Sequence, residues 1–366
     1  MKLEINKISN QISFEIYLKS VESFNVTNPF YKIWFSNIHE NTQDELSYFS
    51  LRDEKGTLLI LMPIILRRIP HFEKHQNYFD VSSPYGYSGP LFNEAMSRGY
   101  LILFWELVDA WYKDNHVVSE FIRFSLNNNY HFYSGKLVPT LTNVNGCVVD
   151  EVAQWQNFKQ KVRNNYRKSA KEGLKVKFLH KGLTKADIKQ FYDIYITTMS
   201  RIGADKEYRY SLEYFESIIE LSGDDFMIAL VFKGDVAIST ELVLISGTSL
   251  FSFLGGTLSE YFKLRPNDFL KIEVLNWARQ HGYTQYVLGG GRTDGDSLYQ
   301  YKKSFFPNDK DLIFYTGRKI INTKIYKKLD NLLNSSVISE CVNPDEKQNK
   351  QQIGFFPVYR KNAFSN

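Results

Sequence analysis

The second half of the chain opens with two stretches in which apolar residues recur at the spacing of an amphipathic helix. In the first, Thr184 and Asp187 have the spacing of a capping box, and the apolar positions continue to Met199. The second stretch covers about residues 212–221. The pattern therefore predicts two consecutive helices.

Three strand-like segments follow these helices. Their sequences are FMIALVF, VAISTELVLI and LFSFLGG, separated by short turns at Lys233–Asp235 and Ser246–Thr248. Apolar and β-branched segments joined by tight turns are typical of antiparallel strands. A further helix is expected with Asn267 as its N-cap, Pro266 just before that cap and Gly282 at its end. The short buried strand YVLGG comes next.

The first half repeats this order in outline. A hairpin is predicted from LSYFSLRD and TLLILMPIIL, followed by a strand at NYFDV, a helix from about Glu94 to Tyr112 and a strand at SEFIRFSL. We therefore predict an α/β (α+β) protein with two similar units, residues 1–150 and 151–315, and with residues 316–366 packing back on the first. Hairpins and helices alternate in many α+β proteins, so this order alone does not define a fold.

A basic helix is predicted between the two units, in WQNFKQKVRNNYRKSAKEG. One face is apolar, and Gly173 ends the helix. The adjacent face carries cations spaced four apart: Lys159, Arg163, Arg167 and Lys171. Like charges at this spacing repel each other on a helix. Such a face is either fully solvated, which is the commoner outcome, or binds an anion.

Composition narrows the class of protein only slightly. The 366 residues are 43% hydrophobic and 23% charged, which indicates a folded chain with a substantial core. The net charge of +5 permits an anionic partner without requiring one. We find no signal peptide and no apolar segment long enough to span a bilayer, so a cytoplasmic location is expected, with room for peripheral membrane contact. The oligomeric state is left open.

Common catalytic signatures are absent from the sequence. There is no P-loop, dinucleotide fingerprint, nucleophile elbow or HExxH motif, and the histidines are scattered singly. This argues against a metal enzyme, so no metal is expected. It also argues against a Ser-His hydrolase.

The segment GGGRTDGDSLYQYKKSFF, residues 289–306, is the best candidate for chemistry. Gly290 and Gly291 would let the backbone approach a ligand closely, and Asp296 is placed to cap a short helix. Lys302 and Lys303 leave that helix on neighbouring faces, and a fixed ammonium group could hold a phosphate or stabilise an oxyanion. The alternative is a surface lysine pair beside an aromatic core.

Two further positions are candidates. In SSPYGYSGPLF, Tyr85 and Tyr87 could offer hydroxyls and ring faces to a polar substrate such as a sugar, or could simply pack in a tight turn. Glu241 lies inside a predicted strand, where a carboxylate is costly to bury without a partner. It is either a general base or a residue that faces solvent on a one-sided sheet, and we expect the second.

The order of these segments resembles a known family. VRNNYRKSAKEG, FYDIYITTMSRIGA, GDVAISTELVLISGTSLFSFLGGTLSEYF, NDFLKIEVLNWARQHGYTQYVLGGG and DSLYQYKKSFFP follow one another, and SPYGYSGPLF lies in the first unit. This order is similar to that of the Fem-type peptidoglycan-bridge aminoacyltransferases and their GNAT-superfamily relatives from surface-polysaccharide gene clusters. The similarity covers about residues 155–307, and no single motif is as specific as a zinc signature.

The resemblance implies two tandem GNAT-like units, each a mixed, mostly antiparallel sheet flanked by helices, with a cleft between them. It implies transfer of an acyl or aminoacyl group to an amine of a nucleotide- or lipid-linked saccharide in cell-envelope polysaccharide or peptidoglycan biosynthesis. Lys302 occupies the position of the lysine in the family's aromatic-Lys-x-x-Phe segment, and Glu241 or Asp296 would accept the proton. Substrate or donor contacts are expected from the following residues: Tyr85, Tyr87, Arg163, Arg167, Gly290, Gly291, Arg292, Tyr301 and Lys303.

Two departures from the family pattern leave the donor open. The coiled-coil arm of some Fem enzymes is missing, and so is the usual acetyl-CoA pyrophosphate loop before Asn267. The donor is therefore either an acyl-CoA or an aminoacyl-tRNA, and tRNA is a candidate partner. The alternative function is a non-catalytic RNA- or glycan-binding module that keeps the GNAT scaffold.

Overall fold

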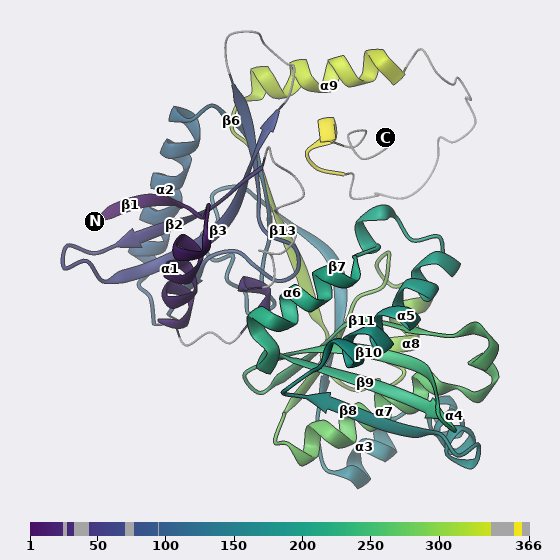
Figure 1. Cartoon of the computed structure of the whole chain (residues 1–366). Coiled ribbons are helices and arrows are strands. Elements are labelled where there is room, and N and C mark those ends of the chain that lie inside the picture. Colours follow the sequence, from purple (N-terminus) through teal and green to yellow (C-terminus); the bar gives the residue numbers. More distant parts are fainter. Residues whose placement is uncertain (25–27, 33–43, 70–76, 94, 338–354, 361–366) are drawn as a thin grey trace. The chain divides into compact units, whose positions relative to one another are not determined.

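The computed structural model describes residues 1–24, 28–32, 44–69, 77–93, 95–337 and 355–360. The chain forms two compact units (Figure 1). Unit 1 contains the described residues of 1–25, 38–140 and 314–366, and unit 2 contains those of 26–37 and 141–313. Each unit is described by itself below.

Unit 1 is a mixed sheet in the order β1–β2–β3–β4–β6–β13. The strands are β1 (Lys2–Lys7), β2 (Asp44–Arg52), β3 (Leu58–Ile69), β4 (Tyr78–Ser82), β5 (Leu91–Phe92), which pairs with β3, β6 (Val117–Arg123) and β13 (Leu312–Ile320). Its helices are α1 (Gln11–Glu22), α2 (Arg98–Asp114), α9 (Thr323–Val337) and the 3-10 turn η7 (Val358–Arg360). Among the described strands of this unit, β4 and β6 are the one pair that runs parallel.

Unit 2 has a sheet in the order β8–β9–β10–β11–β12–β7. The strands are β7 (Lys136–Cys147), β8 (Lys175–His180), β9 (Phe226–Lys233), β10 (Val236–Ser246), β11 (Ser249–Thr257) and β12 (Gln285–Gly289). The α-helices are α3 (Glu151–Asn157), α4 (Gln160–Lys171), α5 (Lys185–Arg201), α6 (Leu212–Ser222), α7 (Pro266–Gln280) and α8 (Ser297–Lys303). The 3-10 turns are η1 (Pro29–Tyr31), η4 (Lys206–Tyr208), η5 (Gly223–Asp225) and η6 (Ser259–Leu264).

The two sheets follow one plan. In each, an outer strand pairs with a three-strand antiparallel meander, a helix crosses over to a parallel strand, and a last antiparallel strand completes the sheet. The crossover helix is α2 in unit 1 and α7 in unit 2. Parallel neighbours require such a crossover. The predicted repetition of hairpin, helix and strand is therefore present in both units.

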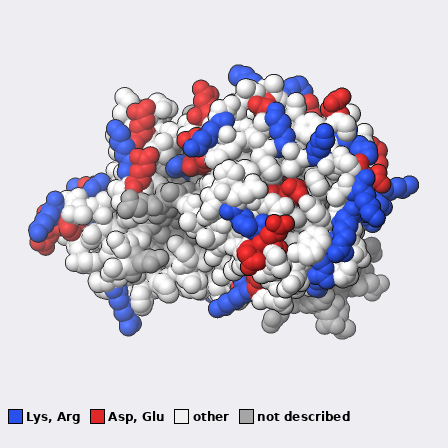
Figure 2. All heavy atoms as spheres, turned by 90° about the horizontal axis from the view of Figure 1, so that it is seen from below, with Lys and Arg blue, Asp and Glu red and all other residues white. Residues whose placement is uncertain are grey.

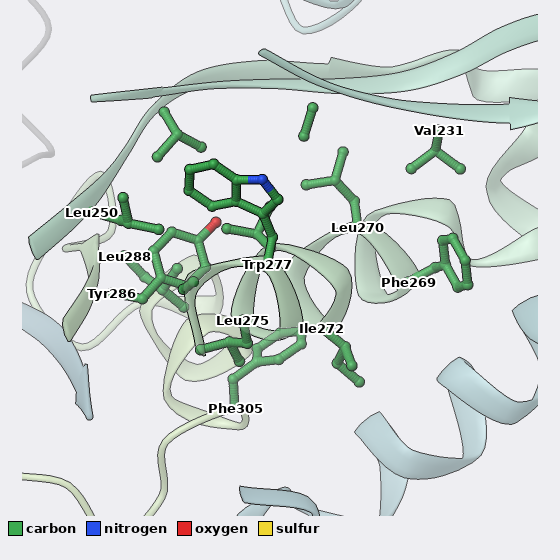
Figure 3. Close-up of a cluster of buried hydrophobic side chains, with 14 of the residues drawn as sticks. Val231, Leu250, Phe269, Leu270, Ile272, Leu275, Trp277, Tyr286, Leu288 and Phe305 are labelled. Atoms are coloured by element: carbon green, nitrogen blue, oxygen red, sulfur yellow. The ribbon is translucent and has the colours of Figure 1, made fainter. Parts of the chain in front are cut away.

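A hydrophobic cluster between α7 and the sheet of unit 2 positions the candidate site (Figure 3). Leu270, Val274 and Trp277 recur at helical spacing and are buried. Figure 3 shows Trp277 of α7 next to Leu250 of β11 and Tyr286 of β12, with Leu270 on its other side, towards Val231. Burying these side chains contributes roughly 1.5–3 kcal/mol each, so α7 is firmly packed on the strands that it connects.

The basic helix expected from Trp155 to Gly173 is wrong in one respect, because it is two helices. The chain breaks at Phe158, whose ψ of 141° is extended, and α4 begins at Gln160. Phe158 is only 3% exposed, so the break places its ring in the core. Lys159 is then an N-cap residue and not part of a continuous charged helix face.

The N-cap assignment of α7 is also corrected. The cap is Arg265, in the left-handed conformation with φ of 59°, and Pro266 is the first helical residue. Proline suits this position because its missing N–H would have no helical partner there. Asn267 lies in the first turn, and its side chain donates a hydrogen bond to the hydroxyl of Tyr301 at 3.0 Å.

The last described residues pack on unit 1 through a buried carboxylate. Asp80 on β4 is fully buried, and its two oxygens accept hydrogen bonds from Arg67 Nε at 2.7 Å and Arg360 Nε at 2.8 Å. The hydroxyls of Tyr359 and Ser119 lie 2.7 Å apart. The segment ending at Arg360 is therefore held by charge as well as by packing.

Replacing Asp80 with alanine should lower the free energy of unfolding of unit 1 by about 3 kcal/mol, because two partly buried guanidinium groups lose their counter-ion. Denaturant unfolding of the variant measures this. As a matched control, Glu45→Ala breaks the exposed Lys7–Glu45 pair and should change stability by less than about 0.5 kcal/mol. Equal effects of the two substitutions would contradict the assignment.

Candidate functional site

An opening in the sheet of unit 2 creates the candidate site. The parallel strands β11 and β12 pair only at Ser249–Phe251 with Gln285–Val287, although β11 continues to Thr257. A pocket of about 570 Å³ lies along the remaining part of β11 and is also lined by β10, the start of α7 and α8. This volume is within the range of small-molecule sites.

Lys302 from α8 lines this pocket. Its Nζ donates one hydrogen bond, to the carbonyl oxygen of Gly290 at 2.7 Å, and the described residues offer it no second acceptor. A lysine ammonium has three N–H donors, so two are left for a ligand. Burial, followed by the charge of Lys271, lowers the pKa of Lys302 to about 8.

Glu241 is buried, so the expectation that it faces solvent is wrong. It is 3% exposed and lines the same pocket. Its Oε1 accepts hydrogen bonds from Lys271 Nζ at 2.7 Å and from the Tyr286 hydroxyl at 2.6 Å. Its Oε2 is buried and accepts no hydrogen bond from the described residues. A buried acceptor without a partner is unusual in folded proteins and calls for an explanation.

Asp268, at the start of α7, is a second carboxylate of the pocket. It is 7% exposed, its Oδ1 accepts a hydrogen bond from Asn165 Nδ2 at 3.0 Å, and burial raises its pKa. The hydroxyl of the buried Ser169 of α4 lies within hydrogen-bond distance of the carbonyls of Leu264, at 2.9 Å, and Arg265, at 3.1 Å. Helix α4 therefore supports the rim of the pocket from behind.

Asp296 caps α8, as the sequence predicts. Its carboxylate accepts hydrogen bonds from the backbone N–H groups of Tyr299, Arg292 and Thr293. These bonds, that of Tyr299 first, lower the pKa of Asp296, which makes it a weaker base. Gly291 leaves room for this cap, because a Cβ there would lie 1.9 Å from Asp296 Oδ1.

The two adjacent lysines have different surroundings. Lys303 Nζ donates to the Asp311 carboxylate at 2.9 Å and to the Asp309 carbonyl at 2.6 Å, so its charge is neutralised within the chain. Tyr301 lines the pocket, and burial raises its pKa well above the usual range. Arg292 is exposed in the loop before α8.

The two arginines predicted from the basic helix also differ. Arg163 Nη1 donates to the carbonyls of Trp155, Gln156 and Phe158, which closes the end of α3. Arg167 is exposed and lies over the ring of Trp155, with Cζ 5.2 Å from the ring centroid. Figure 2 views the molecule from below, which is the side on which α3 and α4 lie in Figure 1. It shows a band of Lys and Arg side chains along one edge of this face.

Tyr85 and Tyr87 belong to unit 1, in the loop between β4 and β5. Tyr85 is 38% exposed, and Arg123 Cζ lies 5.9 Å from its ring centroid. The ring of Tyr87 packs edge-on against Phe314, and burial raises its pKa. Their contact with substrate stays a prediction.

Sequence reasoning missed Lys271, Asp268 and the rim arginines Arg201 and Arg265. Neither rim arginine forms an ion pair with a described residue, although both line the pocket. A signal for Lys271 was present, because it shares a helix face with the apolar residues Val274, Leu275 and Ala278, all of which are buried. A cation on a core face needs a buried partner.

Among the described residues, no group of three or more His, Cys, Asp or Glu side chains is arranged to hold a metal ion. No helix in this part of the chain combines the length and apolar character needed to cross a membrane.

Parts of this chain are similar in sequence to known proteins. A family model for an acetyltransferase (GNAT) domain matches residues 156–303. A Lipid II:glycine glycyltransferase of Staphylococcus saprophyticus is 27% identical over 124 residues, which are 32% of this chain and 27% of that protein. A protein of the same name from Staphylococcus epidermidis is 30% identical over 61 residues, 17% of this chain and 15% of its own length. The chain thus matches only a minor part of each curated relative.

Solved structures match over most of the chain. FemX has a TM-score of 0.61 at 14% identity, with 90% of this chain and 99% of FemX covered. The L-PGS of Bacillus licheniformis has a TM-score of 0.56 at 10% identity, with 92% of this chain and 100% of that chain covered. These matches confirm the predicted fold class. Residues 156–303 therefore match the model of a GNAT acetyltransferase domain, part of the chain is similar in sequence to Fem-like glycyltransferases, and the chain has the fold of FemX.

Proposed function

We propose that the protein transfers an aminoacyl group from an aminoacyl-tRNA to an amine of a lipid- or nucleotide-linked saccharide used in cell-envelope biosynthesis. The observation that carries this proposal is that one pocket holds both a cationic hydrogen-bond donor and a carboxylate that can accept a proton. Lys302 offers unused N–H donors there, and Glu241 keeps one carboxylate oxygen without a partner. The sequence similarity to a glycyltransferase supports an aminoacyl group as the group that is transferred.

The reaction is a direct aminolysis. The acceptor nitrogen attacks the ester carbonyl, a C–N bond forms, and the carbonyl oxygen gains negative charge that the Lys302 ammonium stabilises. Glu241 accepts the proton of the nitrogen and returns it to the leaving ribose oxygen when the C–O bond breaks. Holding both partners in one pocket supplies a further part of the rate.

The rim of the pocket favours a phosphate-bearing donor. Arg201 and Arg265 line the pocket, and neither forms a direct ion pair with a described residue, although the charge of Arg265 acts on Asp268. Guanidinium groups bind phosphates in a bidentate manner. Both tRNA and CoA carry phosphates. We favour tRNA because α7 begins with Pro266, which removes one backbone donor from the first turn, and because exposed cations of α4 offer a surface to RNA.

Mass spectrometry of the products tests the function. The purified protein is incubated with charged tRNAs or acyl-CoAs and a panel of nucleotide- and lipid-linked amino sugars and peptides. We expect an aminoacyl adduct on an acceptor amine with charged tRNA. Products formed only from acyl-CoA would overturn the choice of donor. Donor binding without any turnover would favour the non-catalytic binding module.

Glu241→Gln should lower kcat by roughly 10²–10⁴-fold, the usual contribution of a general base, with little change in KM. The amide keeps the size of the side chain but cannot take the proton. Thr240→Ser, at a neighbouring buried residue that also lines the pocket, is the matched control and should keep most of the activity. Full turnover by a folded Glu241→Gln enzyme would exclude this base.

Activity should fall above about pH 8, because Lys302 loses its stabilising charge as the pH rises through its lowered pKa. Lys302→Arg stays charged in this range, so it should move this decline to higher pH even if its maximal rate is lower. Lys302→Met should lose on the order of 10²-fold in kcat. A pH–rate profile that is unchanged in Lys302→Arg would contradict the role of the ammonium.

A substitution of Asp296 tests whether this residue is a general base or only the N-cap of α8. Asn is as good an N-cap as Asp, so Asp296→Asn should keep activity within about fivefold if the residue only caps α8. A general base would lose far more on the same change. Steady-state rates, with thermal melting as the check on folding, separate these outcomes. A loss as large as that of Glu241→Gln would make Asp296 the base instead.

A further inference from the structure

We propose that Lys271 is a positioning residue, which holds Glu241 from one side so that the second carboxylate oxygen stays open for the proton of the attacking amine. This inference rests on the proposed function. Lys271 comes from α7 and is only 6% exposed. Its Nζ lies 2.7 Å from Glu241 Oε1, and no other described cation forms an ion pair with Glu241.

The donors of Lys271 are fully used inside the protein. Its Nζ donates to Glu241 Oε1 at 2.7 Å, to Ser252 Oγ at 2.8 Å and to the Tyr286 hydroxyl at 3.3 Å. These three acceptors match the three N–H groups of an ammonium. Lys271 therefore has no donor left for a ligand, in contrast to Lys302, which has two.

The hydrogen bonds to Glu241 are strongly one-sided. Lys271 and Tyr286 both donate to Oε1, while Oε2 receives nothing from the described residues. A pair evolved only to neutralise a buried charge would be expected to satisfy both oxygens. The arrangement instead fixes the carboxylate by one oxygen and leaves the other to a group that enters the pocket.

A structural ion pair is the competing explanation, and a double-mutant cycle distinguishes the two. The variants are Lys271→Met, Glu241→Gln and the double substitution, with kcat and KM measured for each. If Lys271 acts through Glu241, Lys271→Met should lower kcat by about 10-fold or more with KM within about threefold. The double variant should be no slower than Glu241→Gln alone. Multiplicative losses in kcat, or a loss confined to KM, would overturn the proposal.

The variants differ in how strongly they threaten folding, so that a loss of activity can be separated from a loss of structure. Lys271→Met leaves a buried carboxylate without its cation and is the variant most at risk, whereas the double substitution removes both charges. Tyr286→Phe removes only one hydrogen bond to Oε1 and keeps the ring in the core. It should lower kcat less than Lys271→Met does, with KM unchanged. An effect on KM alone would again contradict the proposal.

A second readout does not need turnover. The charged groups that act on Lys302 are Lys271 on α7, Glu241 on β10 and Asp296 at the start of α8. Lys271→Met should therefore raise the pKa of Lys302 above about 8, whereas Glu241→Gln should lower it. NMR of ¹³C-dimethylated lysines follows this titration, and Lys302→Arg assigns the signal.

The two readouts separate the inference from the proposed function. Opposite shifts of the Lys302 titration without any turnover would mean that the charge arrangement is right and the transferase function is wrong. Turnover with no shift in either variant would mean that Lys271 does not act at this site, and would overturn the positioning role.

Discussion

The candidate site depends on how briefly two parallel strands pair. β11 and β12 share only three residues of ladder before β11 continues, paired on its other side with β10 alone. The crossover helix α7, which parallel pairing requires, must begin near the end of β11 and return to β12. Its first turn therefore stands at the opening, with Arg265 and Asp268 at the rim of the pocket. The pocket is thus a consequence of sheet topology before any side chain is considered.

Charges inside this pocket are arranged in two groups with different surroundings. Lys271 and the Tyr286 hydroxyl fasten Glu241 by one oxygen, while Lys302 reaches in from α8 with a single backbone contact. The low polarity that makes these groups costly to bury also strengthens their mutual interactions. The same burial, together with Lys271, shifts Lys302 towards a pKa at which its charge responds to the working pH. Supporting contacts come from α4, through Asn165 and Ser169.

Several residues that look chemical in the sequence have structural tasks. Asp296 and Gly291 form the start of α8, Lys303 is paired with Asp311, and Arg163 closes the end of α3. Each of these contacts is short in sequence, within about eight residues. Local contacts of this kind use up donors and acceptors that a ligand would otherwise meet.

The sequence by itself determined the elements and their repetition. The capping box at Thr184 and Asp187 and the turns of the hairpins are local signals, and the structure has them, whereas helical spacing alone did not reveal the break at Phe158. Lys302 and Lys303 were candidates because of the glycine segment before them, and the resemblance to a family chose Lys302 of the two. Only the tertiary structure decided the rest. Glu241 and Lys271 are 30 residues apart in the sequence. Whether a carboxylate on a strand meets solvent or a buried ammonium depends on which helix packs on that face of the sheet. The hydrophobic pattern of the strand contains no information about that helix.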